Sequence, residues 1–545
     1  MLYIKDHFKE RRLLTYRCIA ALLLISFLTL GICARLVYLQ IYKSHFYTTL
    51  SKKNRIEIVP LEPNRGLIYD RNHLLLAKNI PVFSLDIIPS QVKSIDKVIK
   101  QLKKILPISD TEIESFKKTL YQHRRFEEIP LKIKLSDKEV AIFSVNKYRI
   151  PGAVIKARLL REYPFSEADA HVVGYVGRIN AQEVETISQE NYSASNYIGK
   201  IGIEKYYENT LHGQVGYKQI EVDASSNIIR TLGVKPPIPG NDITLTIDSN
   251  LQRAAQTALK GHPGAVVAID PNNGQVLAIS SIPSFDPNVF VKGISTKKYQ
   301  TLQNNPYHPL YNRTTRGLYP AGSTIKPFVA LKALSEGIVT PEDKVYDPGY
   351  FELDNSKHIF HDWKQGGHGW VNIHKAIVVS CDTYFYWLAL RMKIVNIDEV
   401  LNAFGFGSKT GIDLNNELSG LIPSPSWKQA IHGQDWYPGD TLNTIIGQGY
   451  LLTTPLQLAS ATATLSARGL RYQPTLLLSQ HTAGDEEIVA DAVELPPVYA
   501  TQEAYDQLVI AMQDVIRDKE GTGFRFGKNT PYTVGVKTGT AQVSS

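Results

Sequence analysis

The feature that most constrains the fold of this chain is an apolar stretch close to its start. Residues 18–34 carry no charged side chain and directly follow a basic segment, residues 1–17. A run of this length predicts a membrane-spanning helix, whereas a cleavable signal peptide would have a shorter apolar core and a small-residue cleavage site. Because a basic flank stays in the cytoplasm, we expect a cytoplasmic tail over residues 1–17 and a single anchor over residues 18–41. The remainder of the chain is then exported to the periplasm or the cell exterior.

Composition indicates that the exported part is globular and has more than one domain. The chain has 545 residues, of which 43% are hydrophobic and 21% are charged, and its formal net charge is +8. These proportions exclude a disordered chain, and the length exceeds that of one ordinary core. No nucleic-acid motif accompanies the positive charge, so we interpret it as a solvated surface and expect no nucleic-acid partner. Cys381 is the only thiol outside the apolar stretch, which excludes an intrachain disulfide framework in the exported part.

A proline-rich run, residues 234–240, marks a boundary between two exported domains. The first domain, residues 45–239, contains two clusters in which glycines are interspersed with charged residues, at residues 65–72 and 199–213. Neither cluster has an obvious nucleophile. We therefore predict that they form tight turns held by ion pairs, with a structural or interaction role rather than a catalytic one.

From residue 240 onward, the pattern predicts an antiparallel sheet with helices packed against it. Residues 242–248 alternate at the strand period. Two apolar runs, 264–269 and 275–281, flank an Asp-Pro-Asn-Asn-Gly turn and predict a hairpin. A late strand is expected over residues 533–540. With a helical middle, residues 240–545 are predicted to fold as an α+β domain.

Three short clusters occur in a fixed order in this domain and together predict a serine nucleophile. In the first, Ser-Thr-Ile-Lys, Lys326 lies three residues after Ser323 and shares a helix face with it. A serine hydroxyl needs a base beside it, and a lysine acts as that base only if burial or a second cation lowers its pKa. Lys537 is the candidate for the second cation. Ser380 and Asp382, from the Ser-Cys-Asp cluster, are expected to close a third wall of the site.

The last cluster, Lys-Thr-Gly, is predicted to lie on a strand edge. Gly539 allows a substrate backbone to approach closely, so Lys537 and Thr538 can hold a substrate carboxylate. The backbone amides of Ser323 and Thr540 are the expected donors of an oxyanion hole. Each cluster on its own has a more common structural explanation, in which its residues are a helix cap, a solvated charge or a charge at a strand edge. Their occurrence in this order indicates acyl transfer through a serine ester.

These residues resemble the class B penicillin-binding proteins, and within them the elongation branch, over nearly the whole chain. Asp382, at the third position of the middle cluster, is also typical of that branch. The resemblance implies an α+β protein with an N-terminal membrane helix, a mixed pedestal domain over residues 45–239 and a transpeptidase domain over residues 240–545. Because the family continues past Lys-Thr-Gly with further strands and a closing helix, the transpeptidase domain is expected to be incomplete at its C-terminal end. The segments that carry the resemblance are residues 35–40, 65–72, 161–164, 170–175, 199–213, 319–323 and 447–449.

The resemblance implies a D,D-transpeptidase that cross-links peptidoglycan stem peptides during cell elongation. Ser323 would attack the penultimate D-Ala, expel the terminal D-Ala and carry the acyl group, with Lys326 as the proton shuttle. Ser380 and Asp382 would relay protons, and the Lys-Thr-Gly cluster would bind the terminal carboxylate. β-Lactams, which mimic D-Ala-D-Ala, would acylate Ser323.

The resemblance also implies partners and a location. The pedestal would contact a SEDS-family glycosyltransferase and other proteins of the elongation complex, and the anchor would lie in the cell inner membrane with the catalytic domain in the periplasm. Two alternatives share parts of the pattern. One is a β-lactam sensor or hydrolase, and the other is a non-catalytic scaffold that activates the glycosyltransferase.

A second group of side chains lies between the first two clusters and can be interpreted in two ways. Carboxylate, imidazole and thiolate ligands together suit tetrahedral zinc, but surface aspartates, a helix cysteine and a polar loop would account for the same residues. His358 and His361 are competing ligands nearby. The resemblance to zinc-containing members of the elongation branch implies a structural zinc that positions Ser380. The four expected ligands are Asp347, Asp362, His368 and Cys381.

Overall fold

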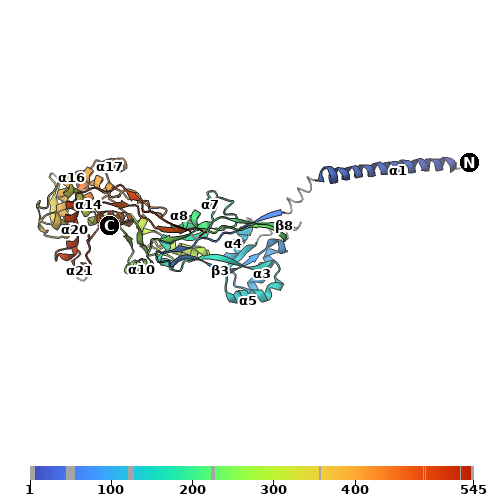
Figure 1. Cartoon of the computed structure of the whole chain (residues 1–545), viewed down its shortest axis with the longest axis horizontal. Helices are drawn as coiled ribbons and strands as arrows, with labels where there is room; N and C mark the ends of the chain where they lie inside the picture. The colour runs from blue at the N-terminus through green and yellow to red at the C-terminus, as the bar shows by residue number, and fades with distance from the viewer. Residues whose placement is uncertain are drawn as a thin grey trace.

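The computed structural model describes residues 7–44, 56–120, 128–222, 228–354, 357–482, 484, 486–527 and 530–541. The predicted tail, the start of the pedestal and the end of the transpeptidase domain fall partly outside the described residues, at residues 1–6, 45–55 and 542–545. The described chain is elongated (Figure 1). Helix α1 (His7–Val37) lies at one end, and α14 (Lys326–Ser335), α16 (Asp382–Ala403) and α20 (Gln502–Arg517) gather at the other.

Helix α1 has the length and composition of a membrane span. A short π-helix, Tyr38–Tyr42, continues it. The apolar span Arg11–Tyr42 has 32 residues, and its most apolar 18-residue window has a mean hydropathy of 2.3 and is not buried against the rest of the chain. At a rise of about 1.5 Å per residue, this span exceeds the hydrocarbon core of about 30 Å. One apolar helix therefore lies where the sequence predicts a single anchor.

The pedestal is organised around a seven-stranded sheet that includes strands from both halves of the chain. Its members are β2 (Ile68–Tyr69), β3 (Leu75–Ile87), β4 (Ile129–Leu135), β5 (Ala153–Glu162), β10 (Asp242–Leu245), β18 (Leu477–His481) and β19 (Glu487–Val489). The long strand β3 pairs antiparallel with β2, β4 and β5. β10 pairs in parallel with β2 and antiparallel with β18. Segments that follow residue 240 thus complete the pedestal sheet.

Three helices cover the β3–β4–β5 part of this sheet: α3 (Ile95–Ile105), α4 (Asp110–Leu120) and α5 (Asp137–Asn146). Helix α3 buries Val98 and Leu102, which lie one turn apart on one face, as in an amphipathic helix. Their side chains join those of β3 and β4 in one apolar core.

The rest of the pedestal consists of short elements. A three-stranded antiparallel sheet has the order β1 (Ile56–Leu61), β8 (Gly216–Val222), β9 (Ile228–Lys235). A separate pair, β6 (Tyr175–Arg178) and β7 (Tyr197–Ile201), precedes the helices α8 (Gly202–Tyr206) and α9 (Glu208–His212).

The two glycine-and-charge clusters of the pedestal meet in a buried ion-pair network. Arg65 donates from Nε to Glu204 Oε2 at 2.7 Å and from Nη2 to Glu208 Oε2 at 2.7 Å. Arg161 donates to Glu204 Oε1 at 2.7 Å, and the Tyr163 hydroxyl donates to the same oxygen at 3.0 Å. Burial alone would raise the pKa of Glu204, but the charges of Arg161 and Arg65 outweigh it and lower the pKa below its ordinary value.

The second half of the chain combines a β-hairpin with a helical core, so the predicted α+β class is confirmed. The hairpin strands are β11 (Gly264–Ile269) and β12 (Val276–Ile282), close to the predicted runs. The prediction of a strand over residues 533–540 is wrong: this segment has no strand pairing in the described residues. A strand needs a neighbouring ladder, and here the Val536 amide donates instead to Met512 O, at 2.9 Å, in α20.

Candidate active site

Ser323 lies on a 3-10 turn, Gly322–Ile325, that leads directly into the buried helix α14. The turn is clamped between two distant segments. The Gly322 amide donates to Gly447 O at 2.8 Å. Gly322 has φ +57, and a Cβ there would lie 2.6 Å from Thr540 O. Only glycine fits this position, and its close approach brings the Ser323 turn against Thr540.

Lys326 is fully buried at the start of α14. Its Nζ donates to Ser380 O at 2.9 Å and to Asp382 Oδ1 at 2.6 Å, and it lies 5.1 Å from the centre of the Phe385 ring. A buried ammonium needs such partners, because desolvation alone would disfavour its charge. The first two sequence clusters are therefore joined through this side chain.

Ser380 occupies a strained turn between α15 (Ile373–Val378) and α16. Its φ of +58 lies in the left-handed region, which non-glycine residues seldom adopt. The turn is held from two sides. Trp363 Nε1 donates to Val379 O at 3.1 Å, and Asp362 Oδ2 accepts the Asp382 amide at 2.7 Å. These contacts hold the backbone of the turn that carries Ser380.

The third cluster reaches the second through Lys537. Its Nζ donates to Ser380 Oγ at 2.8 Å and to Thr538 O at 2.9 Å. Burial lowers the pKa of Lys537 well below its ordinary value, and the Lys326 charge lowers it further, while Asp382 opposes the shift. Lys537 is desolvated beside a cation that Asp382 already pairs, so burial and the neighbouring charge both favour its neutral amine.

One pocket of about 690 Å³ connects the three clusters. Ser323, Ser380, Asp382, Thr538 and Thr540 line it, whereas the buried Lys326 lies behind its wall. Gly539 packs against the Ser323 turn, since a Cβ there would lie 2.6 Å from Thr324 Cγ2. The pocket also has lining residues that the sequence analysis did not select, namely Ile359, Phe360, Trp363, Tyr386, Asn443, Ile446, Gln448 and Thr522.

Of these missed residues, only Gln448 had a signal in the sequence. It lies in the Gly-Gln-Gly segment that carries part of the family resemblance, and its Nε2 donates to Thr540 O at 3.5 Å. Nothing in the spacing or type of Thr522 and Trp363 marks them. They reach the pocket through turns whose positions depend on distant helices.

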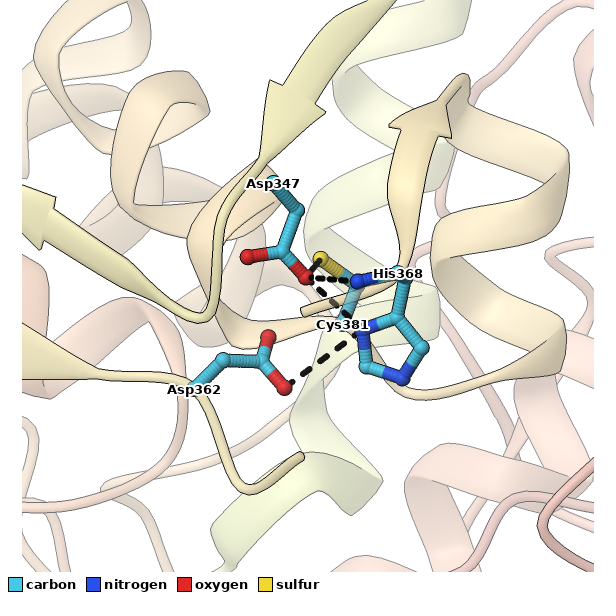
Figure 2. Close-up of side chains that lie close together, drawn as sticks. All are labelled: Asp347, Asp362, His368 and Cys381. Carbon is cyan, nitrogen blue, oxygen red and sulfur yellow. Dashed lines mark hydrogen bonds and ion pairs between the residues drawn. The ribbon is translucent and has the colours of Figure 1, made fainter. Parts of the chain in front are cut away.

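The four candidate metal ligands lie close together (Figure 2). One of them, Asp362, also lines the pocket. All four are buried, and their ligand atoms lie within 4.8 Å of one another. They come from the end of β13 (Val345–Asp347), from the turn after β15 (Ile359–His361), from the residue before β16 (Gly369–Val371) and from the N-cap of α16. His358 and His361 are not members of this group; they are exposed and line the pocket.

Asp347 is the centre of the contacts within the group. Its Oδ2 accepts from His368 Nδ1 at 2.8 Å and from Cys381 Sγ at 3.4 Å, as Figure 2 shows. Asp362 Oδ1 lies 3.5 Å from His368 Nδ1. Burial raises the pKa of the Cys381 thiol, and the carboxylates of Asp362 and Asp347 raise it further. Two carboxylates, an imidazole and a thiol in one buried cluster match the donor types of a tetrahedral zinc site.

Comparison with known proteins identifies the family. Residues 60–245 match the penicillin-binding protein dimerisation domain, and residues 264–545 match the penicillin-binding protein transpeptidase domain. The chain therefore belongs to the penicillin-binding protein transpeptidases, which confirms the resemblance seen in the sequence. It is similar to the peptidoglycan D,D-transpeptidase MrdA of Acinetobacter baumannii, with 45% identity over 99% of this chain and 80% of that protein. The MrdA of Escherichia coli K12 is 41% identical over 99% of this chain and 86% of its own length.

Solved structures of penicillin-binding proteins also resemble this chain. Pseudomonas aeruginosa PBP2 in complex with WCK 5153 matches with a TM-score of 0.69 and 38% identity, over 89% of this chain and 86% of that chain. Helicobacter pylori PBP2 in complex with MreC matches with a TM-score of 0.77 and 33% identity, over 89% of both chains.

Proposed function

We propose that this chain cross-links peptidoglycan as a D,D-transpeptidase and that Ser323 carries the acyl group. The observation that carries the proposal is that Ser323, Ser380 and Thr538 line one pocket, while the side chains of Lys326 and Lys537 both donate hydrogen bonds to Ser380. The direct test is D-alanine release from a stem pentapeptide by the full chain in the presence of an amine acceptor. A chain that binds the peptide but releases no D-alanine contradicts the proposal.

The reaction has two acyl-transfer steps and needs no cofactor. In the first, Ser323 Oγ forms an ester with the carbonyl carbon of the penultimate D-Ala, the amide bond to the terminal D-Ala breaks, and the serine proton passes to the leaving amine. In the second, an amine of a neighbouring stem peptide attacks the ester and forms a new amide. Its proton returns to Ser323. β-Lactams stop at the first step, because their opened ring stays attached to the serine.

Each wall of the pocket has a distinct role in these steps. Lys326, held by Asp382, shuttles the proton of Ser323, and Ser380 relays it toward the leaving amine. The amides of Ser323 and Thr540 stabilise the developing oxyanion, a role supported by the close packing of their segments at Gly322. Lys537 and Thr538 bind the substrate carboxylate.

The lowered pKa of Lys537 predicts an alkaline limit to carboxylate recognition. An ammonium attracts the carboxylate and a neutral amine does not, so acylation should fall as pH rises through this pKa. That fall should begin well below the ordinary lysine pKa of 10.5, because burial and Lys326 favour the neutral amine. The measurement is the pH profile of the second-order rate of penicillin acylation. In Lys537→Arg, whose side chain stays charged, the limit should move to higher pH; a wild-type rate that is constant to pH 10 would refute this assignment.

The second part of the proposal is a structural zinc held by Asp347, Asp362, His368 and Cys381. The support is chemical: two carboxylates, an imidazole and a thiol lie together in one buried group, these are ligand types that zinc binds, and a bound cation would displace the thiol proton. Bound there, the ion would anchor the N-cap of α16, which adjoins the strained Ser380 turn.

We expect purified protein to contain about one zinc per chain and Cys381→Ser to contain much less. Chelation should also lower the thermal unfolding midpoint of the wild type by several degrees, since an ion bound only by the folded state stabilises it. Cys33→Ser, which removes a cysteine of α1, is the matched control and should keep its zinc. Equal, near-zero metal content in all three proteins would reject the site.

We also propose a cellular location for the enzyme. Helix α1 lies in the inner membrane, the basic tail lies in the cytoplasm and the pocket lies in the periplasm, where the enzyme cross-links peptidoglycan during cell elongation. A SEDS-family glycosyltransferase and other elongation proteins are the proposed partners. The support is that similar proteins have been solved with MreC and within a peptidoglycan synthase complex, the latter at 27% identity and a TM-score of 0.69. A scaffold without catalysis or a β-lactam hydrolase is less favoured, since both MrdA relatives are transpeptidases.

A further inference from the structure

A threonine outside the three clusters contacts the Lys-Thr-Gly cluster and the helix that precedes the Ser-Cys-Asp cluster. Thr522 lies in the turn between α20 and α21 (Phe524–Gly527) and lines the pocket. Its Oγ1 lies 2.7 Å from Thr538 Oγ1. Its amide donates at 3.3 Å to the carbonyl of Val378, two residues before Ser380. One residue therefore contacts the Lys-Thr-Gly segment through its side chain and the helix before the Ser380 turn through its backbone.

The position of Thr522 is fixed by close packing on α20. A Cβ on the preceding residue, Gly521, would lie 2.2 Å from Val515 O, so this turn can approach the helix only because it carries glycine. The same helix holds the Lys-Thr-Gly segment, because the Val536 amide donates to Met512 O at 2.9 Å. The backbone segments that carry Thr522 and Thr538 are therefore both held against α20.

The chemistry of the hydroxyl pair sets a direction for the proton between them. Each threonine hydroxyl has a single proton to donate, and an ionised carboxylate can only accept. When Thr538 donates to a substrate carboxylate, its own proton is used. The hydrogen bond between the two hydroxyls must then be donated by Thr522. A chain of this kind is strengthened by the charge at its end.

We propose that Thr522 is a positioning residue for carboxylate recognition, which donates to Thr538 Oγ1 and so directs the Thr538 proton toward the substrate. The inference rests on the proposed function, because the carboxylate is that of the terminal D-Ala or of a β-lactam. Without the Thr522 donor, the Thr538 hydroxyl is free to rotate, and its lone pair loses its partner in the pocket wall.

The test compares a charged and an uncharged probe on the same full-length protein. Second-order acylation rates are measured with benzylpenicillin and with its methyl ester, for the wild type, Thr522→Val and Thr522→Ser. We expect Thr522→Val to lower the rate with the free acid about ten-fold, in line with the loss of a hydrogen bond that serves a charged group. The rate with the ester should stay within about two-fold, and Thr522→Ser, which keeps the donor, should restore the rate with the acid.

Two results overturn the inference. Equal losses with acid and ester would show that Thr522 only supports the fold, since a smaller folded fraction lowers both rates together. A further ten-fold loss when Thr522→Val is added to Thr538→Val would show that Thr522 acts without Thr538. If neither probe acylated the wild type, the proposed function itself would be wrong. That result would be seen before any variant was compared.

Discussion

Replacement of Ser323 with alanine should abolish covalent labelling by a fluorescent penicillin, to below about one thousandth of the wild-type rate. Ser323 lies on a turn clamped by Gly447 and Thr540, and the buried Lys326 follows it at the start of α14. The pocket would still bind the drug without forming an ester, because Lys537 and Thr538 are unchanged. The measurement is labelling of the purified chain after denaturing electrophoresis.

Ser466→Ala is the matched control for this variant. Its hydroxyl is exposed on α19 (Pro455–Ser466) and donates to Ala463 O, so its loss should change neither labelling nor unfolding. D-alanine release from a stem pentapeptide should disappear together with labelling in Ser323→Ala. Labelling that persists in this variant would show that another residue carries the acyl group, and it would contradict the mechanism.

Much of the site could be predicted from sequence because its motifs encode local chemistry. The spacing of Ser323 and Lys326 places both at one helix start, and residues of all three clusters line one pocket. The hydrogen-bond partners of the two lysines could not be predicted in the same way. Lys326 bonds to Asp382, and burial lowers the pKa of Lys537, because the groups that surround each lysine come from segments far apart in the chain. Such environments exist only after folding.

In the fold, too, elements set by neighbouring residues could be predicted, whereas elements that depend on distant segments could not. The hairpin β11–β12 follows from two apolar runs around a turn, whereas a strand over residues 533–540 depends on a ladder that local alternation cannot guarantee. Thr522 is a stronger example. A threonine between two glycines carries no period or motif, and its contact with Thr538 arises from packing on α20. Sequence patterns therefore identify reactive residues more easily than they identify the residues that position them.

Replacement of Glu204 with glutamine should destabilise the pedestal by about 3–5 kcal/mol, because it leaves the buried guanidinium of Arg161 and that of Arg65 without their shared carboxylate. The side chain of Glu204 is fully buried, so water cannot replace the lost charge. A loss of this size is a large part of the stability of an ordinary domain. Urea unfolding of the full chain at pH 7 measures it. Glu162→Gln is the matched control: its pair with Lys78 is more than a third exposed on both sides, so less than about 1 kcal/mol should be lost.

The pH dependence of the stability difference between the wild type and Glu204→Gln gives an independent check. The pKa of Glu204 is lowered on folding, so the unfolded chain holds a proton on this residue more readily than the folded chain does. Its contribution to stability is therefore complete above the unfolded pKa, near 4.5, and is lost as pH falls through the lower folded value. The wild type should thus lose its advantage over Glu204→Gln as the pH falls below 4.5. An advantage that stayed constant from pH 7 to pH 3 would show that the packing of the side chain, and not its charge, holds Arg65 and Arg161 in place.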